Sequence, residues 1–382
     1  MTPLLRHDLH DAGGRRVFVY GPLQGALPAG ENGGRDGLHK RLDPFTRTWV
    51  AVSASRNARP NDARPDNPPD ECPLCPGGTE LPFPYECAVF ENRFPALAAD
   101  PSPVLAGAYA APAVGRCEVV LYTDEHEGSL ATLADDAFGR VLAMWRDRSR
   151  ELWSDPRHEY VMIFENRGVA AGATLSHPHG QIYAFDHLPP VQREKAAALE
   201  EHRARTGDCL SCAVRDADER QHERCVAAND SFVVSVPYAA RWPYEVHVRA
   251  RRHGLRRLAD LREDEELDLA LALRDVVWRY DRLFEEPLAY MMAAQEAPSD
   301  GDDWHLHFEF SPLNRSASQL KVRASVETAT GFFINDTLPE AGAGALQRIT
   351  VPDLRLSRDA LRTVVAAPRE DREVATLARP AH

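Results

Sequence analysis

Residues 177–181 read His177-Pro178-His179-Gly180-Gln181, and this run carries the most specific signal in the chain. In an extended segment residues two apart face the same side, so His177, His179 and Gln181 form one row. Pro178 and Gly180, which alternate with the residues of this row, are poor residues for a strand interior, which disfavours a pair of histidines that only fills a core. A neutral, oriented imidazole is a competent nucleophile toward phosphorus, whereas a glutamine amide can hydrogen-bond phosphate oxygens without acting as a base. We therefore expect His179 to be the nucleophile and Gln181 to assist it.

A second run, residues 305–309 with the sequence His-Leu-His-Phe-Glu, ends a series of features that repeats the order found before His177. Each series opens with Cys-x-x-Cys, continues through a strand-like segment to a lone histidine, and then has a stretch of helical periodicity and a tyrosine-led strand. The lone histidines, His126 and His253, precede the two pairs by almost the same number of residues. This order predicts an internal duplication, to which chance similarity is the alternative. The helical stripes are Phe138, Val141, Leu142, Trp145 and Leu152, then Leu269, Leu273, Val276, Val277, Tyr280 and Phe284.

The same order of elements sets the expected architecture. Strands followed by a helix and further strands predict an α+β or α/β arrangement; we expect an α+β fold with a mainly antiparallel sheet flanked by helices. The two related halves would have adjacent or continuous sheets. Composition then suggests four segments: a partly disordered N-terminal extension over 1–40, a first half with the reactive row over 41–190, a second half over 191–365, and a flexible tail over 366–382.

Two Cys-x-x-Cys pairs are candidate metal sites. Zinc takes four tetrahedral ligands from thiolate and imidazole, and Cys72 and Cys75 with His126 and His177 form such a set. A redox pair is the rival, but it normally begins a helix, and Cys75 is followed by Pro-Gly-Gly. By the duplication we expect an equivalent set in the second half, unless its Cys-x-x-Cys is vestigial. That second set is Cys209, Cys212, His253 and His305.

Composition excludes several classes of function. The formal net charge of −13 and a pI of about 5.6 argue against binding to nucleic acid or to an anionic membrane, because both need a basic surface. No segment approaches the roughly 20 apolar residues of a membrane helix, and the N-terminus has no apolar signal core. Seven cysteines, an odd number, disfavour a disulfide framework. We expect a cytoplasmic protein without nucleic-acid or membrane partners.

The segment before the reactive row is rich in small residues. Residues 166–174 read Asn-Arg-Gly-Val-Ala-Ala-Gly-Ala-Thr, and their backbone N–H groups are suited to lining a phosphate pocket. Such a loop is a weak signal by itself. Its position beside the His179 row makes a phosphate-binding role the better interpretation.

Taken together, these residues resemble class I galactose-1-phosphate uridylyltransferase, the transferase branch of the histidine-triad superfamily. The resemblance runs from about Arg41 to Leu320, and the His-Pro-His-Gly-Gln run with an upstream Cys-x-x-Cys is its most specific part. It implies histidine-triad-like halves, a homodimer, and ping-pong transfer of UMP from UDP-glucose to galactose 1-phosphate through a uridylyl-histidine. Further matching motifs are Asp43-Pro44, Trp49-Val50, Cys72-Pro-Leu-Cys75, Phe90-Glu-Asn-Arg-Phe-Pro-Ala-Leu97, Phe164-Glu-Asn-Arg-Gly168, Val236-Pro-Tyr238 and Arg315-Ser-Ala317.

The resemblance also implies roles for single residues. His179 would carry the uridylyl group, Gln181 would stabilise that intermediate, and the Cys72 set would bind zinc. Arg56 and Arg59 would bind phosphate in the site of the other subunit. The remaining implied contacts are Asn92 with the ribose, Asn166, Gly172 and Thr174 with the phosphates, and Lys321 and Glu327 with the hexose.

The second half departs from the family at its iron site, which is built on a glutamate and three histidines. Only His307 matches clearly, because Gln295 and Glu309 stand at two of the histidine positions and Glu194 aligns only with a one-residue slip. We therefore expect little iron and a second zinc at the Cys209 set instead. Phe333 stands about where a sugar-contacting glutamine is expected.

Two rival functions remain open. One is a sister enzyme with the same histidine chemistry that acts on ADP-glucose or dinucleoside polyphosphates, such as a phosphorylase. The other is a non-catalytic, zinc-stabilised nucleotide-binding module. By the duplication, His307 occupies the position of His179 in the other half, with Glu309 in place of Gln181, so we expect the covalent bond at His179 and not at His307.

Overall fold

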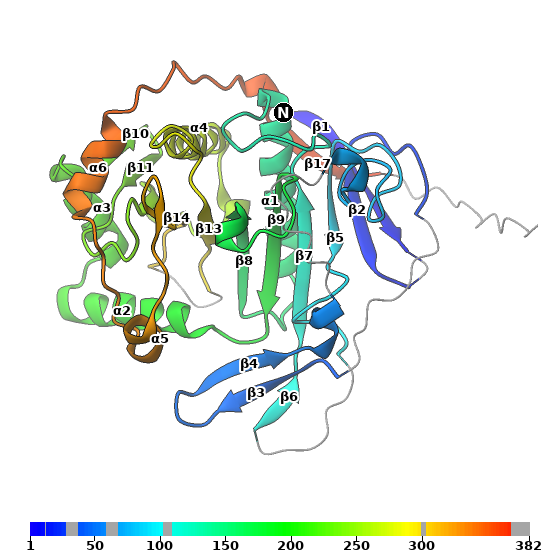
Figure 1. Ribbon diagram of the computed structural model, residues 1–382, viewed down its shortest axis with the longest axis horizontal. Coiled ribbons are helices and arrows are strands. Elements are labelled where there is room, and N and C mark those ends of the chain that lie inside the picture. The colour runs from blue at the N-terminus through cyan, green and yellow to red at the C-terminus, as the bar shows by residue number, and fades with distance from the viewer. Residues whose placement is uncertain (12, 28–36, 59–67, 102–108, 299–302, 368–382) are drawn as a thin grey trace, which may run out of the picture.

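The computed structural model describes residues 1–11, 13–27, 37–58, 68–101, 109–298 and 303–367. Within them, twelve strands form one sheet that runs across the molecule (Figure 1). These strands are β1 (Thr2–His10), β2 (Arg16–Tyr20), β5 (Cys87–Glu91), β7 (Gly115–Leu121), β8 (Tyr160–Arg167), β9 (His179–Phe185), β10 (Cys225–Ala228), β11 (Phe232–Ser235), β12 (Val246–Ala250), β13 (Tyr290–Gln295), β14 (His307–Pro312) and β17 (Arg362–Ala366). Their order is β10-β11-β12-β14-β13-β8-β9-β7-β5-β2-β1-β17.

The sheet is built from two halves that meet at an antiparallel pair, β8 with β13, in which Arg167 lies opposite Tyr290. Moving outward from this pair, β9, β7 and β5 on one side correspond to β14, β12 and β11 on the other. His179 begins β9 and His307 begins β14. The predicted duplication and the mainly antiparallel α+β architecture are therefore confirmed, and the two half-sheets are continuous.

One face of the sheet is covered by α1 (Asp135–Trp153) and α4 (Glu263–Tyr280), one from each half. Both helices begin with acidic residues, which favour a helix N-terminus because they complement its dipole. Their predicted apolar stripes are buried against the strands except for Phe284, which follows the end of α4 and is only partly buried; the Trp145 ring stacks on Phe308 with centroids 6.2 Å apart. Each such side chain contributes roughly 1.5–3 kcal/mol on full burial. The His179 and His307 rows therefore lie on the opposite face of the sheet.

That opposite face is covered differently in the two halves. In the second half, α2 (Pro190–Thr206) approaches the row directly, because Lys195 on this helix contacts Glu309. In the first half a separate three-stranded sheet projects from the molecule (Figure 1). Its strands are β3 (His39–Asp43), β4 (Thr48–Val52) and β6 (Ala110–Pro112); the remaining elements are α3 (Leu210–Arg220), β15 (Asn314–Ser316), β16 (Gln319–Leu320), α5 (Ser325–Thr330) and α6 (Pro339–Gln347), together with short 3-10 turns.

The two ends of the chain correct the predicted segments. Residues 2–10 and 16–20 were expected in a partly disordered extension, but they form β1 and β2, and Val17, Val19 and Tyr20 are fully buried. The strand β17 belongs to the outer edge of the first half, where it pairs with β1 in parallel. The short apolar run Val17–Tyr20 can be buried only because it pairs with β5. The predicted tail beyond residue 367 lies outside the described residues.

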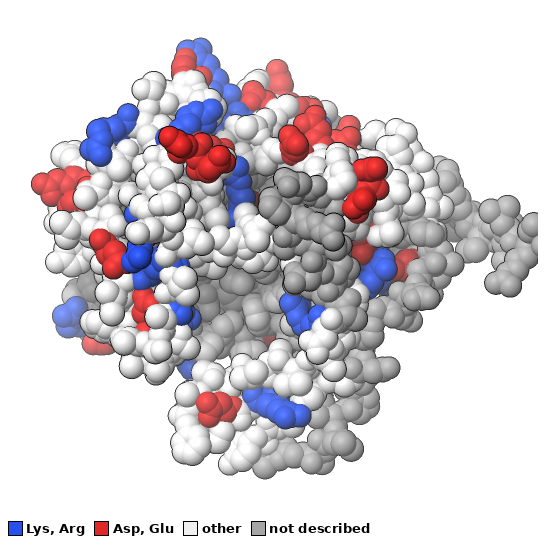
Figure 2. Space-filling model, in the orientation of Figure 1, with Lys and Arg blue, Asp and Glu red and all other residues white. Residues whose placement is uncertain are grey.

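Among the described residues, no helix has both the length and the apolar character that a membrane-crossing helix requires. On the face shown in Figure 2, lysine and arginine side chains are interspersed with aspartate and glutamate.

Candidate active site and metal centres

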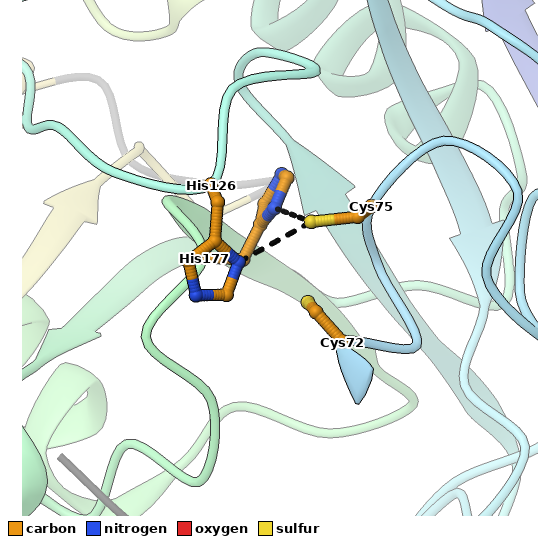
Figure 3. A group of neighbouring side chains, drawn as sticks. All are labelled: Cys72, Cys75, His126 and His177. Carbon is orange, nitrogen blue, oxygen red and sulfur yellow. Dashed lines mark hydrogen bonds between the residues drawn. The ribbon is translucent and has the colours of Figure 1, made fainter. Parts of the chain in front are cut away.

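The first predicted metal set comes together in the structure. Cys72 and Cys75 lie on the loop before β5, His126 follows β7, and His177 precedes β9, and the four side chains converge from these three segments (Figure 3). The Cys75 Sγ is 3.2 Å from His126 Nδ1 and 3.5 Å from His177 Nδ1. All four donor atoms lie within 4.8 Å of one another. A tetrahedral zinc with bonds of ~2.0–2.3 Å needs donor atoms about 3.3–3.8 Å apart, so the set fits that geometry.

The surroundings of this set fix the donor atoms. The His177 Nε2 is 2.8 Å from the Thr123 carbonyl, which can only accept, so Nε2 carries the proton and Nδ1 faces Cys75. Burial lowers the pKa of His177 to about 4, which keeps its ring neutral. Gly78 follows the cysteines where a Cβ would come within 2.6–2.8 Å of three backbone carbonyl oxygens. The chain can therefore fold tightly around the two thiols only with glycine at this position.

The second predicted metal set is also assembled. The His305 Nε2 is 3.5 Å from Cys209 Sγ, 3.6 Å from Cys212 Sγ and 3.1 Å from His253 Nδ1, and the four donor atoms again lie within 4.8 Å. Two local differences distinguish it from the first set. Here Cys209 immediately precedes helix α3, and His305 presents Nε2 where His177 presents Nδ1. Both groups can hold a metal ion.

The predicted reactive row lies at the start of β9. His179 pairs with Leu121 and Gln181 with Val119 of β7, so both side chains point to the sheet face away from α1. The His179 Nδ1 is 2.8 Å from the His177 carbonyl and must donate to it, which makes Nε2 the basic nitrogen. The row is thus oriented through His177, which is itself a member of the first metal set.

Glycine between the two row residues has a steric cause. A Cβ on Gly180 would lie 2.3 Å from the Tyr122 hydroxyl and 3.0 Å from the Phe164 carbonyl oxygen. Contacts below about 3.0 Å do not occur for real Cβ atoms. A side chain at this position would force the buried Tyr122 ring or β9 itself to move, and a shift of β9 would carry His179 with it.

His179 lines two cavities. The larger one, about 960 Å³, is bounded by the predicted phosphate loop, including Asn166, Gly168 and Thr174, and by residues 286–289 from the second half. The smaller one, about 180 Å³, is bounded by Asn92, Thr174 and Gln181. The structure therefore brings the predicted Asn92, Asn166, Thr174 and Gln181 around His179. Gly172 lies on the same loop at φ 81° but does not line either cavity.

Other predicted contacts are not brought to His179 within one chain. Arg56 donates from Nη1 to the Phe94 carbonyl oxygen at 3.0 Å and borders neither cavity. Lys321 and Glu327 are both buried and form an ion pair of 2.6 Å with each other. Arg59 lies outside the described residues.

One residue of the larger cavity was missed from the sequence. Glu165 is buried, accepts a hydrogen bond of 2.9 Å from the Tyr290 hydroxyl, and has its pKa raised to about 7 by burial. Its position between Phe164 and Asn166, inside a motif already singled out, is the signal that was available.

The second-half row is occupied by an ion pair. The Lys195 Nζ is 2.6 Å from Glu309 Oε1 and 3.3 Å from His307 Nε2, and Gln295 Nε2 donates to Glu309 at 3.1 Å. Among the described residues, the groups able to hold a metal are the two Cys/His sets, and His307 belongs to neither. An ammonium group among these side chains does not fit an iron site.

Comparisons with known proteins agree with this geometry. A family model described as "Galactose-1-phosphate uridyl transferase, N-terminal domain" matches residues 34–189, and its C-terminal counterpart matches residues 191–349. A galactose-1-phosphate uridylyltransferase of Thermotoga maritima is 39% identical over 322 residues, which is 82% of this chain and 99% of that protein. One from Streptomyces lividans is 35% identical, over 72% of this chain and 80% of its own length.

Solved structures that resemble this chain include a uridylyltransferase and an ADP-glucose phosphorylase. A structure described as a uridylyltransferase superposes with a TM-score of 0.72 at 30% identity, covering 81% of this chain and 97% of that one. An ADP-glucose phosphorylase from Arabidopsis thaliana, solved with ADP-glucose, has a TM-score of 0.62 at 22% identity, covering 82% of this chain and 99% of that one. At that identity the second similarity speaks for the fold alone.

Proposed function

Because this chain belongs to the galactose-1-phosphate uridylyltransferase family, we propose that it moves UMP from UDP-glucose to galactose 1-phosphate and releases glucose 1-phosphate and UDP-galactose. The observation that carries the proposal is the position of His179, whose oriented imidazole borders both cavities. The enzyme is a nucleotidyltransferase, and the intermediate is a uridylyl-histidine.

The first half-reaction is a displacement at the α-phosphorus. The lone pair on His179 Nε2 forms the nitrogen–phosphorus bond, and the bond from that phosphorus to the bridging oxygen breaks. Glucose 1-phosphate leaves with the electron pair. A phosphate is a good leaving group, so strong help from a general acid is not required.

The second half-reaction reverses the first with another acceptor. An oxygen of galactose 1-phosphate attacks the same phosphorus, and the electron pair of the nitrogen–phosphorus bond returns to Nε2. Gln181 and the Asn166–Thr174 loop would hydrogen-bond the non-bridging oxygens in both steps, where their charge must be stabilised. Asn92, on the other side of His179, would contact the ribose.

We propose that both Cys/His sets bind zinc and that zinc here is structural. Four protein ligands leave no open coordination position, so what the metal supplies is a fixed geometry. At the first set His177 would be held in place, and its carbonyl would in turn hold the Nδ1 proton of His179. A reducing compartment keeps Cys-x-x-Cys thiols available as metal ligands, which supports the cytoplasm as the place of the reaction.

We also propose that the active form is a homodimer. Arg56, Lys321 and Glu327 border neither cavity beside His179, and a second subunit would bring the corresponding residues, with Arg59, to the phosphates and the hexose. Gly172 would contact phosphate through its backbone.

Isotope exchange tests the proposed reaction. Labelled glucose 1-phosphate should enter UDP-glucose without galactose 1-phosphate, because the first half-reaction is complete in itself. His179→Asn should abolish this exchange, whereas the matched variant His307→Asn should retain it. Exchange that survives His179→Asn, or that requires ADP-glucose in place of UDP-glucose, would contradict the proposal.

A further inference from the structure

A cavity of about 410 Å³ lies in the second half, on the sheet face that carries His307 and Glu309. We propose that it is a second ligand-binding site, which takes a nucleotide through its phosphate and its base and does not react with it. The cavity is within the size range of small-molecule sites, roughly 300–1,000 Å³. It is separate from both cavities beside His179, with which it shares no lining residue.

The cavity is the counterpart of the smaller one beside Gln181, because equivalent segments build both. The residues inside each Cys-x-x-Cys contribute, Pro73 and Leu74 in one half and Leu210 and Ser211 in the other. The segment that follows β5 lines the first-half cavity, and the segment that follows the equivalent strand β11 lines the second-half cavity. Likewise, the row of His179 and Gln181 lines the first, and the row of His307 and Glu309 lines the second. This correspondence rests on the proposed nucleotide role of the first-half cavity; the charges described next are independent of it.

The positive charge in the cavity is only partly neutralised. Arg249 is mostly buried, with 18% of its side chain exposed; its nearest ion-pair carboxylate, Asp218, is 3.9 Å away. Its Nη2 lies 2.6 Å from His247 Nδ1, and its buried Nε has no hydrogen-bond partner among the described residues. A buried guanidinium without a hydrogen-bonded carboxylate is costly, and a phosphate bound in the cavity would satisfy it.

Two further cations line the cavity, and its carboxylates are already engaged. Lys195 and Arg241 are the cations. Glu309 accepts from Lys195, while Glu245 accepts from the backbone N–H of Arg241 and contacts His247 at 2.9 Å. The carboxylates therefore orient the cavity wall and leave Arg249 and Arg241 for an anion.

The aromatic residues favour a nucleotide over a sugar phosphate. Tyr238 lines the cavity with 77% of its surface exposed, and Trp242 and Trp304 line it as well. An exposed aromatic ring beside a cationic wall is the arrangement on which nucleic-acid bases stack. A hexose has no flat π-face that would use this ring in the same way.

The same geometry explains why a bound nucleotide would not react. The His307 Nδ1 donates to the His305 carbonyl at 2.8 Å, as His179 does to His177. The remaining nitrogen, Nε2, faces the Lys195 ammonium at 3.3 Å and accepts from it. With its lone pair engaged by a cation that Glu309 holds in place, His307 cannot attack phosphorus.

Equilibrium dialysis of the full-length protein with labelled UMP tests the proposal, because UMP binds without turnover. We expect two sites per chain, of which Asn92→Ala weakens one. Arg249→Met should abolish the second, and Tyr238→Ala should weaken it at least about fivefold, the lower bound for one base stacked on an aromatic ring. Both second-half variants should keep the wild-type rate of exchange between UDP-glucose and glucose 1-phosphate.

Tyr238→Ala guards against misfolding, because the ring is 77% exposed and its contact is with the Arg224 guanidinium, 5.2 Å from the ring centroid, not with Arg249. One UMP per chain, or a second site unaffected by both variants, would overturn the proposal. Competition by glucose 1-phosphate or inorganic phosphate as effective as that by AMP or UDP would overturn the assignment of a nucleotide. Failure of the exchange reaction with two intact UMP sites would count against the proposed function alone.

Discussion

Glu165 makes the stability of this protein depend on pH in a way that one substitution should remove. The residue is 6% exposed and lines the larger cavity, and its carboxyl group accepts a hydrogen bond from the Tyr290 hydroxyl. Burial raises its pKa from 4.5 to about 7, although the nearby charge of Arg167 and the Tyr290 hydrogen bond oppose the shift and Asp281 adds to it.

The sign and size of the effect follow from linkage. The folded protein binds this proton more tightly than the unfolded chain, so the stabilisation is complete below pH 4.5 and is lost as the pH rises through about 7. The full shift corresponds to about 3 kcal/mol, and the part lost between about pH 5.5 and about pH 8 is about 2 kcal/mol. Glu165→Gln should lack this loss and become the more stable protein, relative to wild type, at the higher pH.

Urea unfolding at a series of pH values, with saturating zinc, measures the effect. Other groups titrate in both proteins, so their contributions cancel in the difference between the two unfolding free energies. This difference between wild type and Glu165→Gln should therefore change by about 2 kcal/mol between about pH 5.5 and about pH 8. Glu286→Gln is the matched control, because Glu286 is an exposed carboxylate at the rim of the same cavity. A difference that does not vary with pH, or that changes equally in the control, would refute the reasoning.

Three other predictions concern the site itself. Gly180→Ala should lower kcat about 100-fold, because the clash with Tyr122 displaces His179 by the order of 1 Å. The control Gly344→Ala in α6 should leave kcat unchanged, and unchanged turnover in Gly180→Ala would contradict the steric account. Gln181→His should raise hydrolysis of UDP-glucose relative to transfer, since an imidazole there can activate water; an unaltered ratio in product analysis would argue against it. Metal analysis should find two zincs and little iron per chain, with one lost in Cys72→Ser and the other in Cys209→Ser; loss of both in a single variant would reject independent sites.

The features predicted well from the sequence are those fixed by short spacing. The alternating row at His179 and the Cys-x-x-Cys turns are local patterns of a few residues. The structure brings each Cys-x-x-Cys pair to its two expected histidines, because the strands of the two halves are connected in the same order. The glycine-containing loop at 166–174 borders the larger cavity for the same reason: it directly joins β8 to the row.

The features that were missed depend on contacts between distant segments. β1 pairs with β17 across nearly the whole chain, and β2 pairs with β5; no local pattern in Thr2–His10 or in the short run Val17–Tyr20 reveals these partners. The Lys195 contact with His307 requires α2 to cross the second-half row, which the sequence spacing does not encode. Arg56, Lys321 and Glu327 line neither cavity beside His179, and in the proposed homodimer the corresponding residues would come from a second subunit.

The central claim is that His179 carries a uridylyl group during the reaction. Intact mass measurement after incubation with UDP-glucose, followed by peptide mapping under non-acidic conditions, tests it most directly. We predict one uridylyl group per chain, located on His179, absent from His179→Asn and removed by galactose 1-phosphate. An unmodified protein that still transfers UMP, or a group located on His307 or any residue other than His179, would contradict the account.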